Sequence, residues 1–131
     1  MDVYVIDAHA AIDLVRRGYR GGDDCELFAP TLLRSQVLAI LHAEPGDDDG
    51  DLLDLAERAC RLPRRLLGDA VLRRTAWRIA TEQGWPDTFD AEYIALTRLH
   101  GRALVAEGAA LREKAAGLVP IESVGHLLDR A

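Results

Sequence analysis

The most constraining stretch of the sequence is the apolar run Val3–Ile6, which stops at Asp7. Four consecutive apolar or β-branched residues without polar alternation are typical of a strand buried on both faces of a parallel sheet. The spacing then becomes helical, with Ala11, Ile12 and Val15 on one side. Asp7 therefore lies where a parallel strand ends and a helix begins, where ligand sites collect in α/β sheets. An aspartate also suits the helix N-cap there, so both roles stay open.

Strand and helix signals alternate along the rest of the chain. Short apolar runs predict strands at 27–29, 103–105 and 118–121. Helical spacing, capping residues and breakers predict helices at 31–43, 51–62, 68–83, 88–100 and 109–116, and a last helix that opens at Ser123. Pro30 suits the first position of the helix 31–43, and Val71 is expected to face the core. The alternation predicts an α/β fold, a three-layer α/β/α sandwich around a parallel sheet, as one domain over residues 1–131.

Composition limits the classes of protein that the chain can belong to. The net charge of −6 argues against generic nucleic-acid binding by the whole surface. No run of about 18 apolar residues and no leader sequence occurs, so we expect a cytoplasmic protein without a membrane partner. Cys25 and Cys60 lack metal-site spacing and are expected to be free thiols in a reducing compartment. The acids of 47–51 do not fit a calcium loop and suit the N-terminus of the following helix.

Basic residues are concentrated in one part of the sequence. Seven arginines and one aspartate lie between Arg58 and Arg78, a local charge of +6. Guanidinium groups form two-pronged contacts with phosphate, so this region is a candidate RNA-binding surface. The candidate residues are Arg64, Arg65, Arg73 and Arg74. A solvated helical face without a ligand remains the alternative interpretation.

Two further polar residues lie in otherwise apolar helical patterns. Gln36 is one turn from Leu33 and Ile40, so its amide touches an apolar face and needs a hydrogen-bond partner. A core-edge amide bonded to the backbone would satisfy that need. Asp90 occupies the first turn of the predicted helix 88–100.

The order of these motifs resembles that of a PIN domain, and is closest to the VapC-type toxins of toxin–antitoxin pairs. The resemblance covers nearly the whole chain. The matching runs are VIDA at 5–8, FAP at 28–30 with Gln36 six residues after the proline, FDAEYIAL at 89–96, and LVAEGAAL at 104–111. The run at 89–96 is the most specific of these matches.

The resemblance implies a ribonuclease that depends on Mg²⁺ or Mn²⁺, with four acids gathered at one end of the sheet. On this basis Asp7 and Asp90 are the expected metal ligands and catalytic carboxylates. Gln36 stands where the second acid is usual and is expected to orient a metal-bound water, while Gly108 replaces the fourth acid. With two of four acids absent, we expect a toxin-type ribonuclease of weakened activity.

Three neighbouring residues are candidates for a supporting role in that site. His9 replaces the usual serine or asparagine, and is either a base, a ligand or a structural residue. Glu107 adjoins the missing acid, but it is expected to point elsewhere because adjacent strand residues face opposite ways. Asp87 is a candidate substitute for the missing acid, for which a turn or capping role is the simpler interpretation.

The resemblance also implies partners and leaves other classes of function open. We expect RNA as substrate, an antitoxin protein as partner, and a homodimer. The first alternative is a catalytically inactive PIN module that binds RNA or a protein partner. The second is a structural subunit that pairs with an active homologue.

Overall fold

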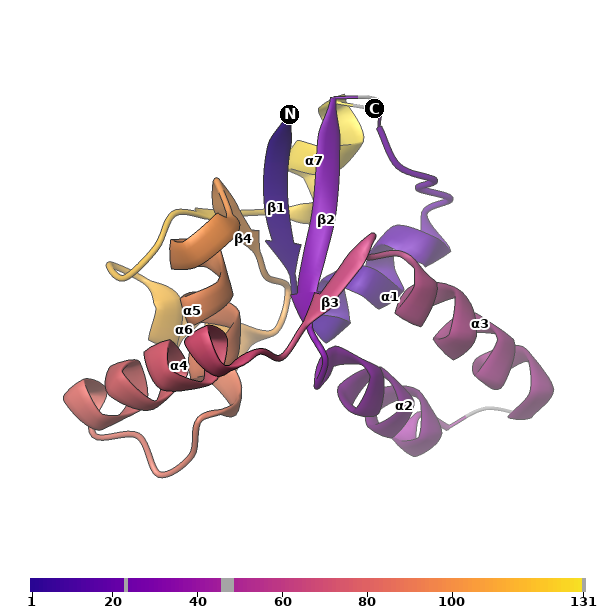
Figure 1. Ribbon diagram of the computed structural model, residues 1–131. Helices are drawn as coiled ribbons and strands as arrows, with labels where there is room; N and C mark the ends of the chain where they lie inside the picture. Colours follow the sequence, from indigo (N-terminus) through magenta and orange to yellow (C-terminus); the bar gives the residue numbers. More distant parts are fainter. Residues whose placement is uncertain (23, 46–48, 131) are drawn as a thin grey trace.

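The computed structural model describes residues 1–22, 24–45 and 49–130 and contains a five-stranded sheet, shown in Figure 1. All strand pairs are parallel, and the strand order is β3-β2-β1-β4-β5. The strands are β1 (Asp2–Ile6), β2 (Cys25–Pro30), β3 (Arg65–Leu67), β4 (Ala103–Val105) and β5 (Ile121–Glu122). The predicted α/β fold around a parallel sheet is therefore confirmed.

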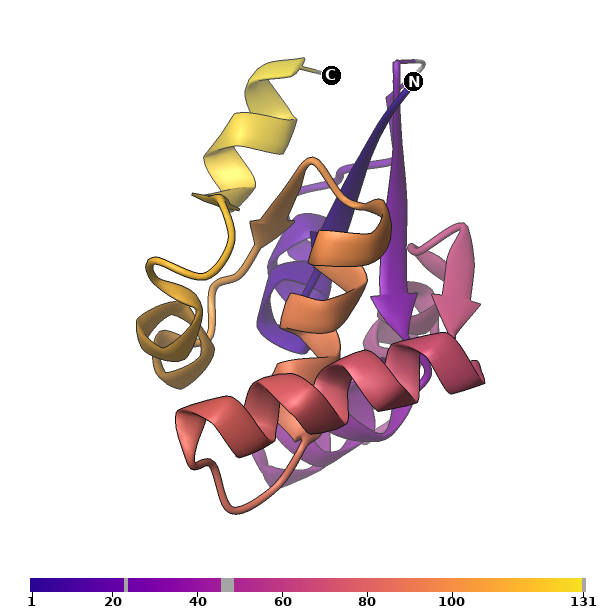
Figure 2. The same ribbon diagram turned by 60° about the vertical axis from the view of Figure 1, so that its left-hand side comes forward.

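Helices cover both faces of this sheet. They are α1 (Ala8–Arg16), α2 (Leu33–Ala43), α3 (Asp49–Arg61), α4 (Ala70–Gln83), α5 (Phe89–His100), α6 (Ala109–Ala115) and α7 (Val124–Arg130). Figure 1 shows α1, α2 and α3 on one side of the sheet and α4, α5 and α6 on the other. In Figure 2, α4 lies across the outer side of α5. Within the described residues, every helix is too short or too polar to span a bilayer.

The strand β1 is the centre of the sheet. Tyr4 pairs with Leu27 of β2 on one side and with Ala103 of β4 on the other. Val5 and Ile6 are fully buried, as predicted for a strand covered on both faces. The carboxyl end of β1 therefore delivers the next residue, Asp7, into the interior beside β4.

The structure corrects the expected start of the second helix. Pro30 is the last residue of β2, in register with Leu67 of β3, and α2 begins only at Leu33. The backbone N–H of Thr31 donates to the carbonyl oxygen of Leu67 at 3.0 Å, so sheet hydrogen bonding continues past the proline. The fixed φ of proline is compatible with a strand end as well as with a helix start.

Other element boundaries also differ from prediction. The strand β3 was not predicted, and β5 starts at Ile121 instead of 118, because Leu118 and Val119 still donate to the carbonyl oxygen of Ala115 in a turn. Val71 is 56% exposed on α4 instead of facing the core. Residues 47 and 48 of the acidic run at 47–51 lie outside the described residues.

Candidate functional site

The sequence-predicted site residues come together in one pocket at the carboxyl ends of β1 and β4. Its volume is about 300 Å³. Asp7 comes from the end of β1, Gln36 from α2 and Asp90 from the first turn of α5, and all three line it. The other polar side chains in its wall are His9 and Tyr93, and the backbone of Gly108 completes that side.

Asp7 is only 4% exposed, and backbone donors surround its carboxylate. The Oδ1 atom accepts hydrogen bonds from the N–H groups of Ala10 at 2.7 Å and Glu107 at 3.2 Å. The Oδ2 atom accepts from the N–H of Gly108 at 2.9 Å. The first contact makes Asp7 the N-cap of α1, and the other two fasten it to the loop after β4.

The pKa of Asp7 is nevertheless raised above its usual value. Burial is the largest cause, and it outweighs the opposing effects of the three N–H donors and of His9. Burial therefore disfavours the charged form of this carboxyl. The N-cap role that the sequence left open is thus present in the structure.

The side-chain oxygen of Gln36 accepts a hydrogen bond from another side chain, whereas the sequence suggested a hydrogen bond to the backbone. The hydroxyl of Tyr93 on α5 donates to Oε1 of Gln36 at 2.6 Å. Tyr93 is 1% exposed, and its pKa is raised chiefly by burial, with added effects of Asp7, Glu92 and Asp90. The phenol therefore keeps its proton at neutral pH and holds the amide oxygen as an acceptor.

Asp90 is paired with the only lysine in the sequence. The Nζ atom of Lys114 on α6 lies 2.9 Å from Oδ2 of Asp90. The same ammonium group lies 5.4 Å from the centre of the Trp85 ring, in a cation–π contact. The hydrogen bond to Asp90 is the main cause that raises the pKa of Lys114, so the ammonium group keeps its proton at neutral pH.

His9 and Gly108 face each other at the remaining wall of the pocket. A Cβ atom added to Gly108 would lie 3.0 Å from Nδ1 of His9 and 3.1 Å from Oδ2 of Asp7. The φ of Gly108 is −71°, so its backbone does not require glycine. The imidazole therefore limits the space in which a side chain at position 108 would lie.

The side chains of the other two candidate acids, Glu107 and Asp87, form hydrogen bonds outside the pocket. The Oε1 atom of Glu107 accepts from the N–H of Val124 at 2.8 Å and so ties α7 to the loop after β4. This confirms that its side chain points away from the pocket. The Oδ1 atom of Asp87 accepts from the N–H of Phe89 at 3.1 Å, which is a capping contact at the start of α5.

The donor set does not fit a strong Mg²⁺ or Mn²⁺ site as it is arranged. Hard divalent cations are held by free, charged carboxylate oxygens. Both oxygens of Asp7 already accept hydrogen bonds, Asp90 is paired with Lys114, and Gln36 is neutral. Over residues 1–22, 24–45 and 49–130, no group of three His, Cys, Asp or Glu side chains is placed to hold a metal ion.

The arginines form no single surface. Arg58 lies on α3, where it pairs with Asp54 at 3.1 Å, and Figure 1 shows α3 across the sheet from α4. Arg64 pairs with Glu26 at 3.0 Å, and the Arg65 guanidinium lies 5.3 Å from the centre of the Phe28 ring. Arg73 and Arg74 instead lie on α4, where they line a groove of about 300 Å³ together with Trp77 and Arg78.

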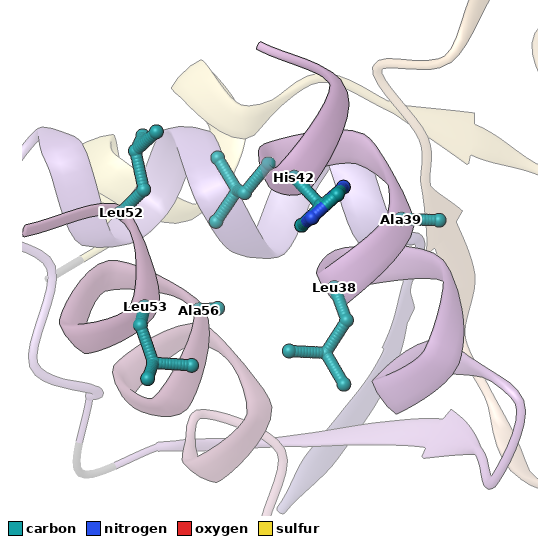
Figure 3. Close-up of a pocket in the computed structure, with 7 residues that line it drawn as sticks. Leu38, Ala39, His42, Leu52, Leu53 and Ala56 are labelled. Carbon is teal, nitrogen blue, oxygen red and sulfur yellow. The ribbon is translucent and has the colours of Figure 1, made fainter. Parts of the chain in front are cut away.

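A larger pocket lies between α2 and α3, as Figure 3 shows, and its wall consists mainly of leucine and alanine side chains. Its volume is about 490 Å³. Leu38 from α2 and Leu53 from α3 are 48% and 53% exposed, and their side chains extend into the space between the two helices. His42 is the polar residue in its wall.

Together the fold and the pocket define a protein with a five-stranded parallel sheet of order 3-2-1-4-5, an architecture compatible with a PIN-like fold. No model of a known protein family matches the sequence, and a search of curated proteins found no match.

The sequence did not predict the roles of several residues in the pocket and in the arginine groove. Tyr93 lies inside the run that carries the resemblance, but nothing in its spacing showed that it would bond Gln36, 57 residues away. Lys114 is 24 residues from Asp90, and no local pattern joins them. Trp77 had a usable signal, because it follows Arg73 by four residues and Arg74 by three, the spacing of one helix face.

Proposed function

We propose that this chain is a VapC-like PIN-domain protein that acts in the cytoplasm by binding RNA, without efficient metal-dependent cleavage. The observation that carries this proposal is the contact of 2.9 Å between Lys114 and Asp90. One of the two remaining family acids is neutralised by an internal cation. The other, Asp7, caps α1 and fastens the loop after β4.

RNA binding is supported by the distribution of charge. The chain carries a net −6, yet the exposed side of α4 presents Arg73, Arg74 and Arg78 together. Among the described residues, no carboxylate forms an ion pair with these three guanidinium groups. An acidic surface elsewhere repels a polyanion and favours its docking at this one face.

A metal-dependent ribonuclease of weak activity is the second candidate. The observation in its favour is that Asp7, Gln36 and Asp90 line the same pocket. This candidate requires Lys114 to release Asp90 before a cation binds. The two candidates differ in their response to metal, which the first experiment measures.

The test combines RNA binding, metal binding and cleavage on the purified protein. We expect a fluorescein-labelled RNA to bind in EDTA, and we expect Mn²⁺ to give no gain in RNA affinity, only weak metal binding with a Kd above about 1 mM in calorimetry, and no cleavage. Mn²⁺-dependent cleavage that disappears in Asp7→Asn would establish the second candidate instead. Failure to bind RNA with or without metal would reject both.

The proposed protein partners are a second copy of the chain and a small antitoxin-type protein. The apolar pocket between α2 and α3 supports a protein contact, because Leu38 and Leu53 are large exposed apolar side chains. Such a contact leaves the outer face of α4 accessible, since α4 packs against α5 on the other side of the sheet, as seen in Figure 1.

A further inference from the structure

The outer face of α4 carries an exposed tryptophan in the middle of an arginine groove. The side chain of Trp77 is 69% exposed. Arg73, Arg74 and Arg78 line the groove beside it. An exposed aromatic side chain among cations suits a ligand that has both negative charge and a flat apolar face.

Trp77 has no structural task in the protein core. The inner face of α4 already buries Leu72, Ala76 and Ile79 against the rest of the molecule. Asp69 caps the helix, because its Oδ1 accepts from the N–H of Leu72 at 2.9 Å. The helix is therefore held in place by residues on its other side and at its end, so the indole is free to serve in binding.

Within the described residues, the guanidinium groups around Trp77 have no acidic partner, whereas several other arginines are paired. Arg16, Arg58 and Arg102 each pair with a carboxylate within 3.3 Å. Arg73 instead donates from Nη1 to the carbonyl oxygen of Gly68 at 2.6 Å, which fixes its direction and leaves its charge uncompensated. Across the ranges that the structure describes, Arg74 forms no ion pair either.

We propose that this groove binds an unpaired stretch of RNA, with one base stacked on Trp77 and the flanking phosphates held by Arg73, Arg74 and Arg78. The inference rests on the proposed RNA-binding function and specifies the form of the RNA. A base can stack on an indole only when it is not covered by its neighbours in a duplex. Arginine forks then contact the phosphates on either side.

A second copy of the chain fits this surface less well. A two-fold interface places the same patch against itself, so it would bring the arginines of both copies together. That repulsion is absent for a polyanion. The charge of the groove therefore favours RNA over self-association as its occupant.

The two tryptophans of the sequence allow a direct measurement of stacking. The variant Trp85→Phe leaves Trp77 as the only tryptophan, and Trp85 lies apart from the groove, beneath Lys114. We expect a single-stranded 12-nucleotide RNA to quench the Trp77 fluorescence, because a stacked base quenches an indole. The same sequence as a duplex should leave the emission nearly unchanged.

Binding affinities of matched variants provide the second measurement. Trp77→Ala should weaken binding of the single strand by about ten-fold, within the range for loss of one stacked base, and Trp77→Phe should recover most of it. Phe89→Ala is the control, because Phe89 is 56% exposed and lies outside the groove. Circular dichroism of each variant tests whether the fold is intact, which we expect because the substituted side chains are exposed.

The outcomes separate this inference from the proposed function. Tight RNA binding that Trp77→Ala does not change, or equal affinity for the duplex, would overturn stacking while RNA binding stands. Absence of any RNA binding would overturn both. A poly-glutamate of equal charge that binds as tightly as the RNA, or a dimer that Trp77→Ala dissociates, would assign the groove to a protein partner and reject the inference.

Discussion

The ammonium nitrogen of Lys114 and the Oδ2 atom of Asp90 lie 2.9 Å apart and join α6 to α5 beside the acidic pocket. A divalent cation at Asp90 would need the oxygen that this lysine holds, and it would meet a positive charge at the same place. The lysine therefore competes with metal for one of the two aspartates that line this pocket.

Removal of that competitor should increase metal affinity. In Lys114→Met we expect Mn²⁺ to bind about three- to ten-fold more tightly than in the wild type, the size of a coupling in a partly exposed ion pair. Calorimetric titration measures the Kd. Lys114→Arg is the control, because it keeps the charge. An unchanged Kd in the methionine variant would show that Asp90 does not take part in metal binding.

The raised pKa of Asp7 gives stability a defined pH dependence. Its folded-state pKa lies above the usual 3.8 because of burial, so the folded protein takes up this proton at higher pH than the unfolded chain. Relative to Asp7→Asn, the free energy of unfolding of the wild type should therefore increase as the pH falls from 7 through the folded-state pKa to about 4. Urea unfolding of both proteins across this range measures the difference. The opposite slope would mean that the N–H donors outweigh burial.

Placing acids at positions 36 and 108 should create a metal-dependent gain in stability. Gln36→Glu keeps the size of the side chain and its contact with the Tyr93 hydroxyl. Gly108→Asp needs space, so His9→Ser accompanies it, since Nδ1 of His9 lies 3.0 Å from the added Cβ. Four crowded carboxylates should lower the melting temperature without metal. Mn²⁺ at about 100 times its Kd should then raise it by about 10 °C.

The matched control for this triple variant is the same set of changes in an Asp7→Asn background. It should lose most of the response to Mn²⁺, and any metal-dependent RNA cleavage gained by the triple variant should disappear with it. A triple variant that folds but binds Mn²⁺ no better than the wild type would mean that the four positions do not form a metal site.

The arginines of α4 predict how RNA binding responds to salt. Each phosphate contact on a single strand contributes a slope of about −0.7 to the logarithm of the binding constant against the logarithm of salt concentration. Arg73→Ala with Arg74→Ala should flatten the slope by about 1.4 and weaken binding. The charge-matched control, Arg20→Ala with Arg98→Ala, changes exposed arginines outside the groove. If both double variants weaken RNA binding equally, the groove contributes only through the net charge of the protein and is not a specific binding site.

The apolar surface of α2 and α3 predicts a homodimer. Leu38 and Leu53 are about half exposed beside a pocket of about 490 Å³, and burial of such side chains stabilises an interface. We expect a dimer by light scattering at micromolar concentration, and a monomer for Leu38→Asp with Leu53→Asp. Val71→Asp is the control, because Val71 is an equally exposed apolar residue on α4. A monomeric wild type would reject the dimer.

The central strand could be predicted from the sequence because its residue pattern is typical of a buried strand. The apolar run Val3–Ile6 predicted a buried strand, and it lies in β1 at the centre of the sheet. The strand β3 escaped because Arg65–Leu67 is short and polar at its start, and it is extended through pairing with Phe28–Pro30. Pro30 was assigned to a helix because a fixed φ near −65° suits both a helix start and a strand end.

The site was predictable in position and much less so in its contacts. The position of a strand end and the family resemblance indicated Asp7, Gln36 and Asp90 as site residues. These three residues line one pocket. The hydrogen-bond partners of these residues lie 24 to 101 residues away in the sequence, such as the Lys114 ammonium for Asp90 and the backbone N–H of Gly108 for Asp7, and no local sequence pattern indicates such contacts. The pKa values of these residues depend on burial, and burial can be read only from the folded structure.

The order of strands has a consequence for how this chain is made. The strand β1 pairs with β2, which follows within 30 residues, but its other edge waits for β4 at Ala103–Val105. The carboxylate of Asp7 can accept its hydrogen bond from the N–H of Gly108 only after residue 108 has been synthesised. At about 5–20 residues per second, a ribosome leaves that apolar strand edge unpaired for on the order of ten seconds. The strand β1 is synthesised before the other strands of this sheet but is fully paired only late, so a nascent chain stalled before residue 103 leaves one edge of β1 open to chaperones and to other nascent chains.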